Sequence, residues 1–153
     1  MRFKTGTKTY VFPAFKKDAQ FVLRKNKNTK TEVEEVSLLF RPPPSVNNCY
    51  RAYRGRMIKS PAYRFWQHIE MQLYKDENRR VTGNLKVEVI VHTGKGWRAN
   101  RDLDNLLKPL LDMLILIGVI EDDNSKIVRE VLVKMNVPRI KSFAVIEVNI
   151  TKL

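Results

Sequence analysis

Cysteine, histidine and long apolar runs are all scarce in this chain. Cys49 is its single cysteine, which excludes an intramolecular disulfide and is typical of a protein in a reducing cytoplasm. One cysteine and two histidines, His68 and His92, cannot build a structural zinc site by themselves. No apolar run approaches the roughly 20 residues of a membrane-spanning helix, and the segment from Met1 lacks the apolar stretch of a signal peptide. We therefore expect no membrane association and a cytoplasmic location.

Acidic residues are also few relative to basic ones. The 153 residues include 29 Lys and Arg against 16 Asp and Glu, which gives a formal net charge of +13. Such an excess attracts polyanions, chiefly nucleic acid. Charge alone leaves DNA and RNA open, and it is equally typical of ribosomal and other RNA-binding proteins, or of basic proteins without a specific partner.

Length and patterning predict one α+β domain that follows a basic extension. Residues 1–33 mix short apolar pieces with the basic run Arg24 to Lys30, and we interpret them as an N-terminal extension that adds nonspecific affinity for DNA. Residues 34–153 form the predicted domain. Alternating apolar residues predict strands at 36–40, 84–92, 131–137 and 146–150. With two helices between them, the order predicts a single mixed sheet packed against two main helices.

Both helices carry recognisable end signals. Ser60 is a good N-cap and Pro61 a good first helical residue. The apolar positions expected to pack in the core from this helix are Ala62, Phe65, Trp66, Ile69 and Leu73. The second helix is expected from about 104 to 117, with Gly118 as its terminator. Pro109 predicts that this helix is distorted or starts later than its pattern suggests.

The few acids of this basic chain bunch around the second helix. Asp102 and Asp104 are two residues apart, and Asp122 and Asp123 follow the helix in a polar turn. Carboxylates are the ligands that Mg²⁺ prefers, and a bound metal ion would offset their repulsion of DNA. Lys108 lies on the helix face of Asp104, where it could orient water or stabilise a transition state.

Structural explanations for the same acids remain open. Asp104 could simply cap the helix, and the two later aspartates could be ordinary turn residues. Asp112, inside the apolar helix, is expected either to be exposed or to pair with a basic side chain. Since a helix over 104–117 is roughly 20 Å long, Asp123 can approach Asp102 only if residues 118–123 return along it.

Two clusters combine basic and aromatic residues. The first, before Ser60, contains Tyr50, Arg51, Tyr53, Arg54, Arg56 and Lys59. The second, beside the acids, contains Lys95, Trp97, Arg98 and Arg101. Such clusters can hold phosphates and stack on unpaired bases at a branch point, or they can be solvated basic loops. By contrast, His92 is interpreted as an ordinary residue at a strand end.

Several of these segments together resemble the RusA family of Holliday junction resolvases. The segments are Pro43-Pro-Ser-Val-Asn-Asn-Cys-Tyr-Arg, Arg101-Asp-Leu-Asp-Asn-Leu-Leu-Lys, Asp112-Met-Leu and Gly118-Val-Ile-Glu-Asp-Asp. The resemblance covers about residues 36–150 and indicates a phage or prophage origin.

The resemblance implies a homodimer that resolves four-way DNA junctions by paired nicks, using Mg²⁺ or Mn²⁺. It places the essential aspartates at Asp102, Asp104 and Asp123, which would hold the metal, and the essential lysine at Lys108. With it, we expect phosphate contacts from Arg51, Arg54, Arg56, Lys59, Arg98 and Arg101. Two alternatives stay open: a non-catalytic branched-DNA-binding protein, and an RNA-binding protein or ribonuclease.

Overall fold

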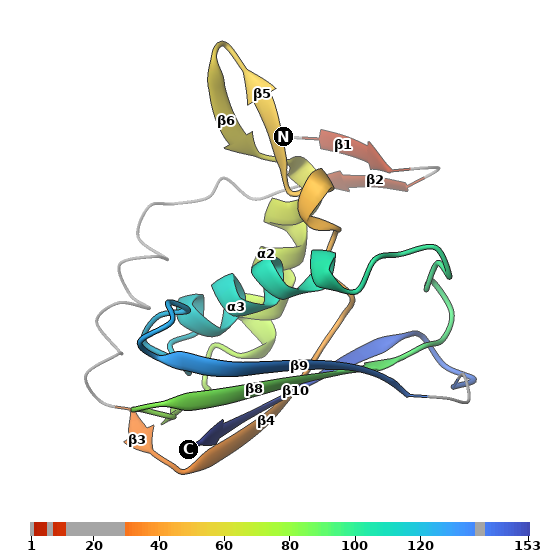
Figure 1. Ribbon diagram of the computed structural model, residues 1–153. Coiled ribbons are helices and arrows are strands. Elements are labelled where there is room, and N and C mark those ends of the chain that lie inside the picture. Colours follow the sequence, from red (N-terminus) through yellow and green to blue (C-terminus); the bar gives the residue numbers. More distant parts are fainter. Residues whose placement is uncertain (1, 6–7, 12–29, 137–139) are drawn as a thin grey trace.

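A mixed four-stranded sheet forms one layer of the protein, and the helices lie on one of its faces (Figure 1). The computed structural model describes residues 2–5, 8–11, 30–136 and 140–153, with side chains from residue 30 onward. The strands of the sheet are β4 (Glu35–Phe40), β8 (Leu85–His92), β9 (Val128–Asn136) and β10 (Val145–Lys152). Their order is β4-β10-β8-β9, and β10 runs antiparallel to both neighbours, while β8 and β9 are parallel.

Alternation of side chains explains why these segments are strands. The burial of β8 alternates strictly, with Leu85, Val87, Val89 and Val91 fully buried and the residues between them half-buried. Across β10, Val148 is opposite Val89 on one side and Leu38 on the other, so the apolar side chains form continuous rows. One face of the sheet is therefore apolar and requires cover.

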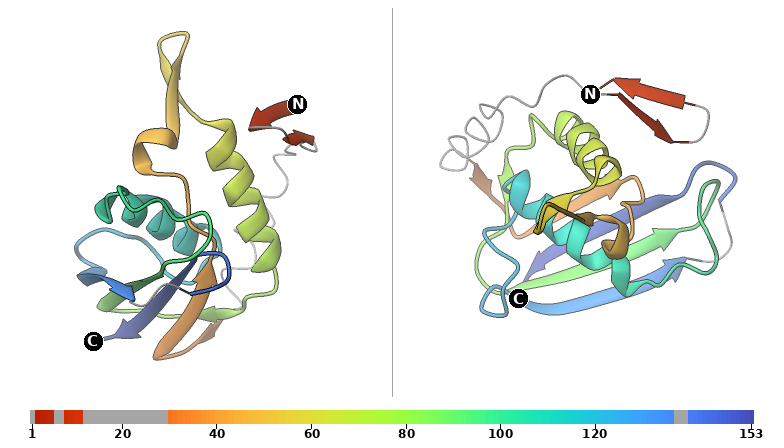
Figure 2. Two further views of the ribbon diagram at one scale, coloured as in Figure 1. Left: turned by 90° about the vertical axis from the view of Figure 1, so that its right-hand side faces the viewer. Right: turned by 90° about the horizontal axis from the view of Figure 1, so that it is seen from above.

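Two helices cover this face, as the sequence predicts. Helix α2 (Pro61–Leu73) lies above the β4 side of the sheet, and α3 (Leu107–Leu116) lies above the β9 side (Figure 2). Ser60 caps α2, because its hydroxyl accepts a hydrogen bond from the Tyr63 amide at 3.2 Å. The expected α+β architecture, with a mixed sheet and two main helices, is confirmed.

The buried face of α2 differs from the predicted one. Of the five positions expected in the core, Trp66 is buried, Phe65 and Ile69 are half-buried, and Ala62 and Leu73 are exposed. The residues of α2 that face the core are Tyr63, Trp66, Gln67, Glu70 and Met71. The prediction was wrong by part of a helical turn, because Gln67 and Glu70 find polar partners inside. Glu70 accepts a hydrogen bond from the Arg41 amide, and Gln67 accepts one from Lys59.

Helix α3 starts later than the apolar pattern suggests, as Pro109 predicts. A short 3₁₀ turn, η3 (Asp104–Leu106), precedes it, and Pro109 falls in the first α-helical turn, where its missing N–H needs no partner. Gly118, with φ of +75°, ends the helix. The bonds from Gly118 N to Ile115 O and from Val119 N to Leu114 O form a Schellman motif.

Shorter elements surround this core. They are β1 (Arg2–Thr5) paired with β2 (Lys8–Val11), β3 (Thr31–Glu32) paired with β7 (Arg79–Arg80), the 3₁₀ turn η2 (Val46–Asn48), and the hairpin of β5 (Tyr50–Tyr53) and β6 (Arg56–Lys59). Of the basic run Arg24 to Lys30, only Lys30 lies within the described residues. Val137, the last residue of the predicted strand 131–137, also lies outside them. Within the described ranges, each helix is too short or too polar to cross a membrane.

Candidate active site

Lys108 is the centre of a charged network on the first turn of α3. Its ammonium group lies 2.7 Å from Asp112 Oδ1, one turn further along the helix, and 3.0 Å from Asp123 Oδ2. The hydrogen bond to Asp112 is the largest of the effects that raise the pKa of Lys108, and Asp123 adds to it against the opposing effect of burial. Lys108 therefore carries a fixed positive charge at neutral pH.

The loop after α3 brings Asp123 to this network. Residues 118–127 turn back along the helix, so that a residue fifteen positions after Lys108 contacts it. Asp122 fixes the turn, since its carboxylate accepts hydrogen bonds from the Asp123 amide and from Asn124, which lower its pKa. The segment after α3 therefore does run back along the helix and carries Asp123 to its first turn.

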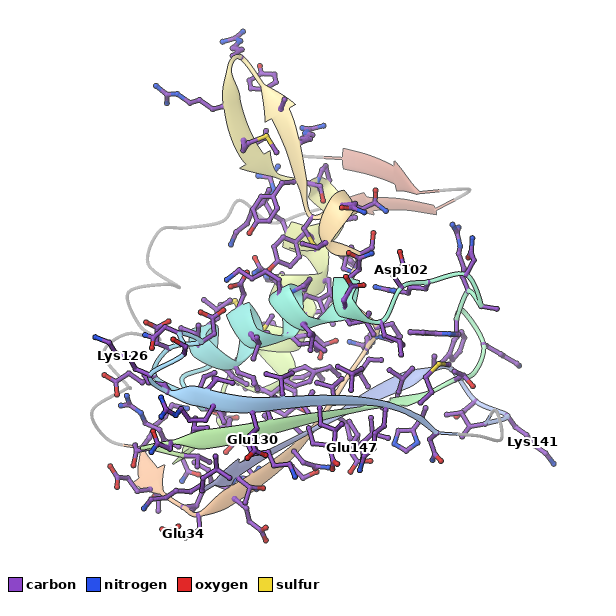
Figure 3. The ribbon with its side chains drawn as sticks, viewed as in Figure 1. Glu34, Asp102, Lys126, Glu130, Lys141 and Glu147 are labelled. Atoms are coloured by element: carbon purple, nitrogen blue, oxygen red, sulfur yellow. The ribbon has the colours of Figure 1, made fainter. Side chains whose placement is uncertain are left out.

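Asp102 and Asp104 lie just before α3, on the N-terminal side of Lys108. Asp104 opens η3, one helical turn before Lys108, and both aspartates are exposed. Asp102 is at the opposite end of α3 from Lys126 (Figure 3), and it accepts a hydrogen bond from Asn105 at 3.4 Å. In the part of the chain that the structure describes, the three predicted aspartates do not form a closed group that could hold a metal ion. Instead, the Asp123 carboxylate forms an ion pair with Lys108.

Tyr63 and Asp112 belong to this network, although the sequence did not single out Tyr63. The fully buried Tyr63 hydroxyl donates a hydrogen bond to Asp112 Oδ2 at 3.2 Å. Burial, followed by the charge of Asp112, raises the pKa of Tyr63, so its hydroxyl stays a donor. Asp112 thus forms an ion pair with Lys108, which is one of the two arrangements expected for it from the sequence. The spacing of four residues between Lys108 and Asp112 could have indicated this ion pair from the sequence, whereas no sequence pattern indicated that Tyr63 belongs to the network.

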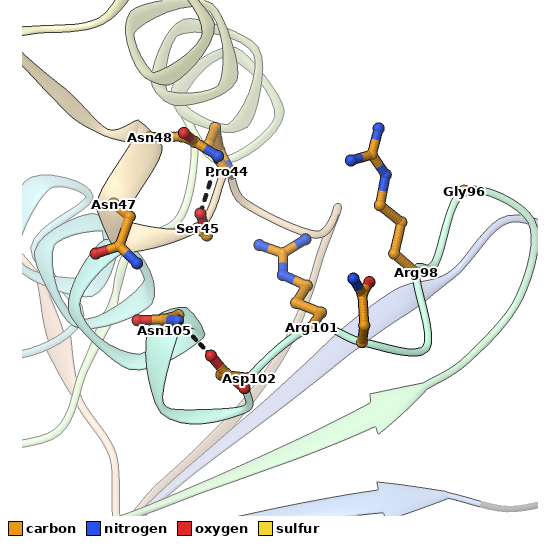
Figure 4. Close-up of a pocket in the computed structure, with 10 residues that line it drawn as sticks. Pro44, Ser45, Asn47, Asn48, Gly96, Arg98, Arg101, Asp102 and Asn105 are labelled. Atoms are coloured by element: carbon orange, nitrogen blue, oxygen red, sulfur yellow. Dashed lines mark hydrogen bonds between the residues drawn. The ribbon is translucent and has the colours of Figure 1, made fainter.

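Arg98 and Arg101 of the second basic cluster line a pocket that also includes Asp102 (Figure 4). Arg101 donates a hydrogen bond to the carbonyl of Pro43, and its guanidinium lies 5.4 Å from the centre of the Trp97 ring. Burial lowers the pKa of Arg101, which nevertheless remains charged. Arg98 is exposed at the edge of the pocket. Both arginines therefore lie beside the acidic site, as the sequence predicts.

The first basic cluster is carried by the β5–β6 hairpin, which projects away from the body of the protein (Figure 1). Arg51, Arg54 and Arg56 are exposed on it, and Arg54, with φ of +48°, and Gly55 form its tight turn. Lys59 differs from the arginines, because it turns inward to donate to Gln67 at 2.9 Å, and burial lowers its pKa. The hairpin therefore presents three exposed arginines, of which Arg54 lies over the Tyr53 ring, and one lysine that is hydrogen-bonded to α2.

Two residues with possible chemistry have structural partners. His92 ends β8, and its Nε2 lies within hydrogen-bonding distance (2.8 Å) of Glu147 Oε2, which agrees with its interpretation as an ordinary strand-end residue. Cys49 is fully buried, its thiol donates to the carbonyl of Ser45, and burial raises its pKa to about 11. A thiol with such a pKa is unreactive at neutral pH.

Comparison with known proteins identifies the family. The family model described as endodeoxyribonuclease RusA matches residues 40–151, which include every residue of the network, the pocket and the hairpin. A relative from Aquifex aeolicus (strain VF5), named crossover junction endodeoxyribonuclease RusA, is 28% identical over 96 residues, covering 61% of this chain and 76% of the relative. Because the family model spans most of the chain, this protein belongs to the RusA family of endodeoxyribonucleases.

Proposed function

We propose that this endonuclease resolves four-way DNA junctions by paired, symmetric nicks, with its chemistry at the turn that joins η3 to α3. The observation that carries the proposal is the network in which Lys108 joins Asp112 and Asp123, one turn from Asp104. A structural role for these groups alone would not require four charged side chains beside an arginine-lined pocket in a chain of net charge +13.

The donor groups of this site suit a hard divalent cation. Asp102, Asp104 and Asp123 offer carboxylate oxygens, which Mg²⁺ prefers and Mn²⁺ accepts. Lys108 now balances Asp123, but its side chain is 53% exposed and has a second partner, so it can release Asp123 to a cation and keep its bond to Asp112. We therefore assign these three aspartates as the metal ligands. A metal ion, when bound, would screen the phosphodiester and activate a water molecule.

In the proposed site, Lys108 stabilises negative charge on the phosphate that is attacked. It is positively charged at neutral pH and is fixed by Asp112, which Tyr63 fixes in turn. An ammonium group held in this way can stabilise negative charge that develops on the phosphate without reorganising during the reaction. Catalysis by Lys108 therefore depends on two residues that do not touch the substrate.

Branched DNA is expected to contact both basic clusters. Arg98 and Arg101 lie next to Asp102 and would hold the phosphates beside the cut. Arg51, Arg54 and Arg56 extend this positive surface along the projecting hairpin. Lys59 would contribute charge from the base of the hairpin rather than through direct contact, because it is bonded to Gln67. Arginines on a protruding element can reach a second arm of a junction.

A homodimer is supported by an uncovered apolar surface on α3 and β9. Leu107, Leu111 and Ile115 form a half-buried stripe along α3. The adjacent edge strand β9 carries Val131 and Met135, which are 44% and 46% exposed although they point to the core face of the sheet. A second copy of the chain would cover this α3–β9 surface. Two equivalent active sites would then match the two-fold symmetry of a junction.

The test is nicking of a labelled four-way junction, a linear duplex and a matched RNA, each with Mg²⁺ and with EDTA. We expect Mg²⁺-dependent paired nicks in the junction alone. Asp104→Asn should still bind the junction but not cut it, whereas Asp76→Asn, which removes an exposed carboxylate outside the site, should cut normally. Tight junction binding without cleavage in Mg²⁺ or Mn²⁺, or a preference for RNA, would contradict the proposal.

A further inference from the structure

The pocket next to Asp102 is built from two segments that are far apart in the sequence. Residues 44–48 form one wall and residues 96–105 the other, and they enclose about 430 Å³ (Figure 4). The hydrogen bond from Arg101 to the Pro43 carbonyl joins the two walls, and Trp97 packs against Arg101 within the second wall. The pocket is therefore part of the folded structure and is large enough for a small organic group.

Neutral polar groups line much of this pocket. Asn48 donates to Ser45 Oγ at 3.1 Å and Asn105 donates to Asp102, so both amides are fixed in place. The side-chain amide of Asn47 is exposed and has no hydrogen-bond partner among the residues that the structure describes. An amide offers one donor and one acceptor side by side, which matches the edge of a nucleobase.

We infer that this pocket receives one unstacked nucleotide of the strand that is cut, and that Asn47 reads the edge of its base. The inference rests on the proposed function, because it places the reacting strand beside Asp102. Arg98, at the edge of the pocket, is positioned for the phosphate of that nucleotide. The volume of about 430 Å³ is sufficient for a single nucleotide.

Such a pocket would make cleavage depend on both structure and sequence. Extruding a base from a duplex costs a few kcal/mol, and the cost is smallest where stacking is already interrupted. The pocket would therefore fill most readily at the branch point of a junction. Among the positions that the branch point can reach, contacts from Asn47 would favour one kind of base.

The first experiment maps nicks on a four-way junction whose homologous core lets the branch point migrate through a defined sequence. The wild type should cut some positions far more than others. Asn47→Ala should lower the ratio of the most used to the least used position about tenfold, within the range that one base contact provides. Asn84→Ala, an exposed asparagine outside the pocket, should keep the wild-type ratio. An unchanged ratio in Asn47→Ala would overturn the inference.

The second experiment needs no cleavage, so it separates this inference from the proposed function. 2-Aminopurine is placed at each position near the branch point in turn, and fluorescence is measured on binding in EDTA. The wild type should raise the signal at one position by unstacking that base. Asn47→Trp, which fills the pocket, should abolish the rise, while Asp104→Asn should keep it. An equal rise with the wild type and a folded Asn47→Trp protein would show that no base enters the pocket.

Discussion

Asp112→Asn tests whether Lys108 acts through its fixed position. The substitution keeps the volume of the side chain and an acceptor for the Tyr63 hydroxyl, but it removes the charge that holds Lys108 at 2.7 Å. Lys108 should then turn to Asp123, its remaining partner at 3.0 Å, which is one of the proposed metal ligands. The proposed site would then lose an oriented ammonium group, and Asp123 would become less available to a cation.

The cost in stability should be small. A helical ion pair four residues apart contributes about 0.3–0.5 kcal/mol. The hydrogen bond from buried Tyr63 changes from a charged to a neutral acceptor, a difference of roughly 0.5–1.5 kcal/mol. The total, about 1–2 kcal/mol, should lower Tm by about 2–8 °C for a chain of this length.

The cost in activity should be larger than the cost in stability. A displacement of about 1 Å of a catalytic group can lower the rate about 100-fold, so we expect kcat to fall about 10- to 100-fold. Junction affinity should change little, because the arginines proposed to bind phosphate are untouched. Single-turnover nicking with enzyme in excess gives the rate, and fluorescence anisotropy in EDTA gives Kd. Asp76→Asn controls for the change in net charge.

Two results would refute this reasoning. One is a folded Asp112→Asn enzyme that nicks at the wild-type rate, which would show that Lys108 does not need Asp112. The other is a change of rate of the same size in both Asp112→Asn and Asp76→Asn, which would assign the effect to overall charge.

Three further predictions follow from the fold. Burial raises the pKa of Glu70 despite the nearby Arg41, so the folded state disfavours its ionised form, and wild-type stability should fall as pH rises above about 4.5, the usual Glu pKa. Glu70→Gln lacks this dependence, so the Tm of the variant relative to that of the wild type should rise between pH 4 and pH 8. A Tm difference that stays constant over this range would contradict the prediction. Val131→Lys on the α3–β9 surface should convert a dimer to a monomer in sedimentation velocity, whereas the opposite-face control Glu130→Lys should not; an unchanged dimer would place the interface elsewhere. Gly118→Ala, at φ of +75°, should lower the free energy of unfolding by about 1 kcal/mol in urea titrations, and no loss would mean that the helix end relaxes.

The sequence by itself predicted the four strands of the central sheet and the residue types of the proposed site. Alternation at Val87, Val89 and Val91 predicts a strand because adjacent strand residues face opposite sides of the sheet, and that period survives any arrangement of the neighbours. Ser60, Pro109 and Gly118 mark the helix ends through local backbone effects alone. The residue types at positions 102, 104, 108 and 123 indicated phosphodiester chemistry on a basic protein.

The tertiary structure decided which groups meet. The core face of α2 was mispredicted because a buried Gln67 and Glu70 are tolerable only where Lys59 and Arg41 come from other segments to bond them. Tyr63 reaches Asp112, and Asp123 reaches Lys108, across separations in sequence that no local period records. The pocket likewise exists only because two distant loops pack against each other. Local patterns fix the elements, but hydrogen bonds and packing between elements fix the site.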